Sequence, residues 1–105
     1  MIVARVIWTE EAFVDLECIH EFIAQHSPKN AHQIIQNILS RTHQLEEFPQ
    51  SGAIEQTLVK RNQEYRYLVE GNYKIIYSYH AQIQTVYIKV IFDTRSDPEE
   101  LLKVT

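Results

Sequence analysis

The sequence is poor in the residues that cross-link a chain, bend it or leave it flexible. Its 105 residues include one cysteine, two glycines and three prolines. A single cysteine excludes an internal disulfide, and so few glycines and prolines argue against long flexible linkers. No apolar run reaches the roughly 18 residues that a membrane-spanning helix needs. The length predicts one domain over residues 1–105, because a second core would not fit.

Basic residues are too few for general nucleic-acid binding. Ten Lys and Arg stand against fourteen Asp and Glu, which gives a net charge of −4. Residues 1–55 contain three cations and eight acids, whereas residues 56–105 contain seven cations and six acids. Any basic surface must therefore be local and in the second half. The opening segment MIVARVIW lacks the long apolar region of a signal peptide, so we expect a cytoplasmic protein that does not engage a membrane.

The first half has the periodicity of a strand followed by two helices. Residues 2–8 are rich in β-branched side chains and predict a strand. A helix is expected over residues 10–26 with Thr9 as its N-cap, and a second over residues 28–48 with Ser27 as its N-cap. Because only one or two residues separate these helices, they should form an antiparallel helical hairpin.

The second half has the pattern of a β-sheet. Strands are expected at residues 65–69, 73–79 and 85–92, with a weaker signal at 57–59. Gly71 and Asn72 fit a two-residue hairpin turn, since both tolerate positive φ. A short terminal helix is expected from Asp97. The order β-α-α-β-β-β predicts an α+β fold whose antiparallel sheet is covered on one face by the helical hairpin.

Alternation along the last two strands predicts which side chains face the helices, because every second residue shares a face. The cleaner apolar rows, expected to face the helices, are Tyr73, Ile75, Tyr77 and Tyr79, and Val86, Ile88, Val90 and Phe92. The opposite rows are Lys74, Ile76, Ser78 and His80, and Thr85, Tyr87, Lys89 and Ile91.

The second of these faces is also expected to collect the cations of neighbouring segments, which are Lys60, Arg61, Arg66 and Arg95. Cations among tyrosines on an open sheet face can hold nucleic acid by charge and stacking. They are equally consistent with a face that is simply solvated. The spacing alone leaves both interpretations open.

The histidines and the cysteine show neither the spacing of a metal site nor the surroundings of a reactive thiol. Four of the five histidines lie on the expected helices, and no two have the i, i+4 spacing of a helical zinc pair; they are His20, His26, His32 and His43. Cys18 has no evident His or Asn partner and is interpreted as an inert, part-buried thiol. The acids of the first helix are interpreted as a solvated face. No metal and no cofactor are expected.

Four segments, in order, resemble the RelE/ParE superfamily, the toxin halves of bacterial type II toxin–antitoxin pairs. They are VIWTEEAFVDLECIHEFIAQHSPKNA, LEEFPQSG, GNYKIIY and VIFDTRSDPEELL. The resemblance covers nearly the whole chain, and the last segment is most similar to ParE-like members. It implies the β-α-α-β-β-β fold and a toxin held inactive by a cognate antitoxin, with operator DNA bound only through that antitoxin. A basic antitoxin segment is an alternative partner for the acids of the first helix.

The resemblance implies two alternative activities. ParE-like toxins inhibit DNA gyrase, whereas RelE-like toxins cleave mRNA on the ribosome without a metal. The nuclease alternative places Lys74 and Arg95 at positions of family cations, with Tyr77, Tyr79 or His80 as the acid. The catalytic tyrosine of the nucleases has no counterpart here, because Leu101 falls at about that point.

The ParE-like interpretation is favoured, since it needs a binding surface and no acid–base pair. The expected surface comprises Lys60, Arg61, Arg66, Lys74, Lys89 and Arg95. A third alternative is a family member that binds an antitoxin and inhibits nothing.

Overall fold

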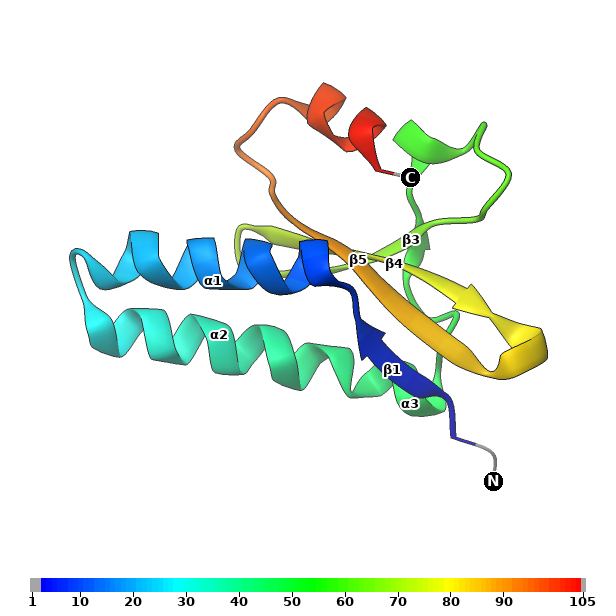
Figure 1. Cartoon of the computed structure of the whole chain (residues 1–105), viewed down its shortest axis with the longest axis horizontal. Helices are drawn as coiled ribbons and strands as arrows, with labels where there is room; N and C mark the ends of the chain where they lie inside the picture. Colours follow the sequence, from blue (N-terminus) through cyan, green and yellow to red (C-terminus); the bar gives the residue numbers. More distant parts are fainter. Residues whose placement is uncertain (1–2, 105) are drawn as a thin grey trace.

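A five-stranded mixed sheet lies at the centre of the molecule, and two long helices pack on one of its faces (Figure 1). The computed structural model describes residues 3–104, so Ile2 of the predicted first strand lies outside the described residues. In chain order the elements are β1 (Arg5–Trp8), α1 (Glu10–Ala24), α2 (Pro28–Thr42), α3 (Gln44–Glu47), β2 (Ala53–Ile54), the 3₁₀ turn η1 (Gln56–Leu58), β3 (Arg66–Glu70), β4 (Tyr73–His80), the 3₁₀ turn η2 (Ala81–Ile83), β5 (Thr85–Asp93) and the 3₁₀ helix η3 (Pro98–Lys103).

The two helix starts are set by the caps that the sequence predicts. Thr9 Oγ1 accepts a hydrogen bond from Ala12 N at 3.2 Å, and Ser27 Oγ accepts one from Asn30 N at 3.1 Å. Each cap satisfies a backbone N–H that has no partner within its helix. The second helix is shorter than predicted: it ends at Thr42, and residues 44–47 form the separate helix α3. Within residues 3–104, no helix is both long enough and apolar enough to cross a membrane.

The sheet has the strand order β1-β5-β4-β3-β2. Strands β2 to β5 pair antiparallel, as predicted, but β1 pairs parallel to β5, which makes the sheet mixed. The physical reason is that β1 reaches the other strands through the helical hairpin, and a long crossover permits a parallel partner where a tight turn does not. The weak strand signal at 57–59 was wrong, because those residues follow a short β2 and enter η1.

A bulge at Lys89 changes the faces of β5. Tyr77 of β4 pairs with Ile88, but the preceding residue of β4 pairs with Val90, so Lys89 is an extra residue on β5. The alternation predicted for β5 is therefore wrong beyond Ile88. Ile91 packs in the helix-side core, whereas Val90 and Phe92 pack on the opposite face. The alternation predicted for β4 is confirmed.

The sheet face away from the helices is partly covered. A second, smaller core lies there, formed by Leu58, Tyr65, Ile76, Phe92, Leu101 and Val104. The segments that supply this cover are η1 and η3, which lie beside each other above the sheet in Figure 1. Arg61 joins them, because its guanidinium Nη2 donates to the carbonyl oxygen of Leu102. Only the part of this face beyond the second core remains uncovered.

Candidate functional site

Lys74 lies on the face away from the helices, as predicted, and is held there by an ion pair. Its Nζ donates to Glu55 Oε1 at 2.9 Å and lies 4.2 Å from the centre of the Tyr67 ring. Glu55 is only 3% exposed, and its other oxygen accepts a hydrogen bond from Thr57 N at 3.2 Å. Burial alone would raise the pKa of Glu55, but the hydrogen bonds from Lys74 and Thr57 lower it overall. Lys74 therefore ties β4 to the start of η1.

Arg66 lies on the opposite side of the sheet from the one predicted. It pairs in register with Tyr77, whose ring belongs to the helix-side core. Its guanidinium donates to Gly52 O at 2.8 Å and to Glu64 Oε2 at 2.9 Å. Arg66 thus fastens the loop before β2 to the sheet edge.

Of the other predicted cations, Lys60, Arg61 and Arg95 lie in loops, whereas Lys89 lies on β5. Lys60 and Arg61 are exposed just after η1, and Arg61 is held by η3. Arg95 lies in the loop after β5, where its guanidinium Nε and Nη2 donate to the two oxygens of Asp93 at 3.0 and 2.8 Å. This contact lowers the pKa of Asp93. The Arg95 side chain is more exposed than that of Asp93, at 61% against 32%, and extends toward solvent.

Tyr77, a candidate acid, is inaccessible. Its side chain is 0% exposed, and its hydroxyl oxygen accepts a hydrogen bond from Gly52 N at 2.9 Å. Burial raises the pKa of the phenol, and the Gly52 contact opposes this shift in part. A β-carbon at position 52 would lie 2.7 Å from the same hydroxyl oxygen, so only glycine fits this close approach. Tyr77 therefore serves the core and cannot reach a bound substrate.

One group of polar residues comes together on the uncovered part of the sheet as alternation predicted. Ser78 Oγ lies 3.2 Å from His80 Nε2, and the imidazole meets the ring of Tyr87 edge-on, with 5.1 Å between ring centres. Lys89 Nζ lies 5.9 Å from the centre of the same ring. Ser78 is 1% exposed, so its hydroxyl is no accessible nucleophile. The group presents one cation, one imidazole and one aromatic ring.

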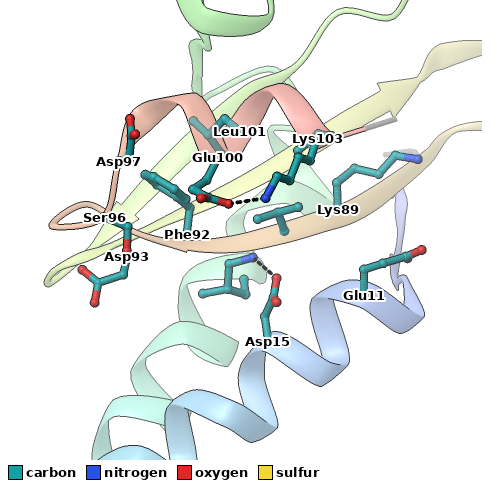
Figure 2. Close-up of a pocket in the computed structure, with 13 residues that line it drawn as sticks. Glu11, Asp15, Lys89, Phe92, Asp93, Ser96, Asp97, Glu100, Leu101 and Lys103 are labelled. Carbon is teal, nitrogen blue, oxygen red and sulfur yellow. Dashed lines mark hydrogen bonds and ion pairs between the residues drawn. The ribbon is translucent and has the colours of Figure 1, made fainter.

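An acidic cleft of about 750 Å³ lies between α1, β5 and η3 (Figure 2). The residues that line it include the apolar side chains of Val90, Phe92 and Leu101. The lining also contains five carboxylates and two lysines, which are Glu11, Asp15, Asp93, Asp97 and Glu100, with Lys89 and Lys103. Lys103 Nζ donates to Glu100 Oε2 at 2.9 Å. A cleft lined by apolar side chains and carboxylates suits a polypeptide that carries apolar and basic side chains.

Asp15 in this cleft has a role that sequence reasoning missed. Its Oδ2 accepts a hydrogen bond from Ile91 N at 3.0 Å, just past the bulge at Lys89. Burial raises the pKa of Asp15, the Ile91 contact lowers it, and the neighbouring Glu11 carboxylate raises it further, with a net increase. The sequence placed Asp15 on a solvated helix face, although it immediately precedes the buried Leu16, which places it at the border of the apolar stripe.

Three of the candidate catalytic residues are held by carboxylates or enclosed in the core. Lys74 and Arg95 are each paired with a carboxylate, and Tyr77 is enclosed. In the part of the chain that the structure describes, no three His, Cys, Asp or Glu side chains are grouped as a metal ion would require. The candidate recognition surfaces beside β5 are the acidic cleft and the group formed by Ser78, His80, Tyr87 and Lys89.

Comparisons with known proteins give a consistent result. A family model for the ParE toxin of the type II toxin–antitoxin system parDE matches residues 6–98. No curated protein sequence matches the chain. The fold is similar to a structure of the chromosomal ParDE system of P. aeruginosa, with a TM-score of 0.68 and 18% identity over 87% of this chain and 96% of that one. It is also similar to the RelBE2 toxin–antitoxin complex of Mycobacterium tuberculosis, with a TM-score of 0.53 and 17% identity over 89% and 93%.

Proposed function

Because this chain belongs to the ParE toxin family of type II toxin–antitoxin systems, we propose that it inhibits DNA gyrase and is neutralised by a cognate antitoxin. The observation that carries the proposal is the extent of the family match, which runs over residues 6–98. This range begins within β1 and reaches the start of η3, so it includes nearly every element of the fold.

The positions of the candidate catalytic residues support a toxin that acts by binding. Metal-independent RNA cleavage needs a base, an acid and cations that can approach the scissile phosphate. Lys74 is engaged by a buried carboxylate, and Tyr77 lies within the core. A toxin that blocks its target by contact requires none of these groups.

The exposed cations are proposed to contribute to contact with the target. Arg95 is exposed in the loop between β5 and η3. Lys89 and the C-terminal segment line the acidic cleft, and Lys89 also contacts the ring of Tyr87 on the opposite sheet face. Lys60 and Arg61 follow η1, which packs beside η3, and Arg61 contacts Leu102 of η3. Lys74 and Arg66 act indirectly in this proposal, because their side chains position the loops around β2.

A gyrase supercoiling assay tests the proposal. The purified chain should inhibit supercoiling of relaxed plasmid, and the product of the neighbouring reading frame, as antitoxin, should restore it. Arg95→Ala should weaken inhibition, whereas Lys29→Ala, at the far end of the helical hairpin, is the matched control and should not. Full supercoiling in the presence of excess chain would refute gyrase as the target.

The same preparation separates the alternatives. Messenger RNA cut within codons in a translation reaction, detected by primer extension, would replace gyrase inhibition with ribosome-dependent cleavage. Undisturbed growth after induction without the antitoxin would instead identify an inactive family member. We place the activity in the cytoplasm, where gyrase, the ribosome and the antitoxin are all found.

A further inference from the structure

The uncovered part of the sheet face away from the helices carries cations and no carboxylate. Val6 and Trp8 of β1 pack against the helix-side core. Their neighbours Arg5 and Ile7 therefore point to the opposite face, because alternate residues of a strand share a face. Strand pairing and contacts bring six side chains together there, and they form the β5 patch: Arg5, Ile7, Ser78, His80, Tyr87 and Lys89.

The two strong cations of the β5 patch are not neutralised by the rest of the described chain. Other Lys and Arg side chains form ion pairs with described carboxylates, and these are Arg41, Arg66, Lys74, Arg95 and Lys103. Neither Arg5 nor Lys89 has an ion-pair partner within residues 3–104. The patch is therefore locally positive on a chain whose net charge is −4, and it favours an anionic ligand.

Tyr87 supplies an aromatic ring between these two cations. Along β5, it lies between Lys89 and the residue in register with Arg5. Lys89 Nζ lies 5.9 Å from the ring centre, near the limit of about 6 Å for a cation–π contact, so the ammonium group can move to a ligand at little cost. His80 meets the ring edge-on and its Nε2 lies 3.2 Å from Ser78 Oγ. The Tyr87 side chain is held by these contacts and is still partly exposed.

We propose that the β5 patch binds a single strand of nucleic acid, and that this strand is the DNA on which gyrase acts. The inference rests on the proposed function, which brings the chain to gyrase and its DNA. A strand with unstacked bases places one base on Tyr87 while Arg5 and Lys89 contact phosphates on either side of it. A duplex keeps its bases stacked and offers the patch only its phosphates.

An acidic polypeptide fits the β5 patch less well than a nucleic-acid strand. A bound peptide obtains its specificity from pockets that take its side chains. The two large clefts of the molecule lie beside the patch, and neither is lined by Tyr87 or His80. A flat aromatic surface with cations on both sides matches a base between two phosphates, because every base has a face that stacks.

Fluorescence anisotropy with the purified chain tests the phosphate contacts. The probe is a labelled oligothymidylate of about 12 nucleotides, titrated over a series of salt concentrations. Two phosphate contacts predict a slope of about −1.4 for log K against log salt, and Arg5→Gln or Lys89→Gln should each make it shallower by about 0.7. The matched control is Lys29→Gln, which removes an exposed cation at the start of α2 and should leave the slope unchanged.

Two further changes test the ring and the charge around it. Tyr87→Leu should weaken binding of the oligothymidylate by about 5-fold or more, whereas Tyr87→Phe keeps a ring and should bind as wild type does. Glu11→Gln should tighten binding by about 2-fold, because it removes a carboxylate from the cleft that Lys89 also lines. A gain in affinity cannot come from misfolding, and melting temperatures verify the fold of every variant.

The source of the strand is tested with gyrase. The double variant Arg5→Gln/Lys89→Gln should inhibit supercoiling at least about 5-fold less than wild type, and Lys29→Gln should inhibit fully. Gyrase inhibition by a wild-type chain that does not bind the oligothymidylate, or by a double variant as potent as wild type, would overturn this inference and leave the proposed function intact.

Other nucleic acids give the remaining outcomes. A duplex of the same length that binds as tightly as the single strand would overturn the stacking of a base on Tyr87. An oligouridylate that binds at least about 10-fold more tightly would assign the patch to RNA and overturn the assignment to DNA. Strand binding that follows the substitutions, without any gyrase inhibition by the wild type, would overturn the proposed function and gyrase as the source of the strand.

Discussion

Replacing Lys74 with methionine should destabilise the fold by about 2 kcal/mol. Methionine keeps an unbranched stem beside Tyr67 but removes the cation from Glu55, which is 3% exposed. Breaking a fully buried pair costs about 3–5 kcal/mol, and an exposed pair contributes about 0–1 kcal/mol. The expected cost of Lys74→Met lies between these two ranges because the Lys74 side chain is 26% exposed. In a domain of this size, 2 kcal/mol lowers the melting temperature by about 9 °C.

The stability that Lys74→Met loses should depend on pH and should be smaller in acid. Burial raises the pKa of Glu55, but the bonds from Lys74 and Thr57 lower it below its ordinary value of 4.5. A lowered folded-state pKa gives stability that is present above the ordinary value and is lost as pH falls through the lowered one. Without Lys74, burial dominates and a protonated Glu55 becomes easier to accommodate. The difference between wild type and Lys74→Met should be largest near neutral pH and should shrink in acid.

Thermal and urea denaturation, followed by circular dichroism, measure this effect. The matched control is Lys103→Met, which breaks an ion pair whose side chains are 78% and 54% exposed and should leave the melting temperature unchanged. The double variant Lys74→Met/Glu55→Gln should recover at least half of the loss, because an uncharged amide costs less to bury than an unpaired carboxylate. Lys74→Met with wild-type stability at pH 7, or a double variant as unstable as the single one, would refute the reasoning.

Substitutions at three further positions probe contacts that the fold depends on, all by chemical denaturation. Gly52→Ala should destabilise by about 1–3 kcal/mol, since the new carbon would lie 2.6 Å from Tyr67 O. Tyr77→Phe should cost about 1–3 kcal/mol because Gly52 N–H loses its acceptor; stability equal to wild type would contradict this. Asp15→Ala should destabilise by about 1 kcal/mol through the loss of the acceptor for Ile91 N–H, whereas Asp15→Asn keeps an acceptor oxygen. Because the pKa of Asp15 is raised, the stability linked to its protonated form is lost as pH rises from the ordinary value of 3.8 through the raised one, so Asp15→Asn should gain on wild type over that range.

Part of the candidate site follows from sequence alone. The grouping of Ser78, His80 and Lys89 on one face was predicted from alternation, and the contacts among Ser78, His80 and Tyr87 confirm it for β4. The position of Lys74 on that face was also predicted. Its ion pair was not, because Glu55 lies 19 residues away and no local pattern links the two.

The sequence by itself determined the features that depend only on residues close together in the chain. The caps at Thr9 and Ser27 need only a side chain and a backbone N–H three residues on. The hairpin after β3 needs a residue that accepts positive φ, and Gly71 adopts a φ of 59°. Together with the hydrophobic periods, these local signals gave the element types and their order, and hence an α+β fold.

Tertiary structure alone decided the features that depend on residues far apart in the chain. The bulge at Lys89 reverses the faces of the end of β5, and the Ile91 N–H beside it is satisfied by Asp15, 76 positions earlier. The parallel pairing of β1 leaves a free edge that no periodicity reveals. Alternation predicts which sheet face a side chain occupies only as long as the strand keeps its pairing register. That register, and which segments cover each sheet face, are set by the packing of whole elements.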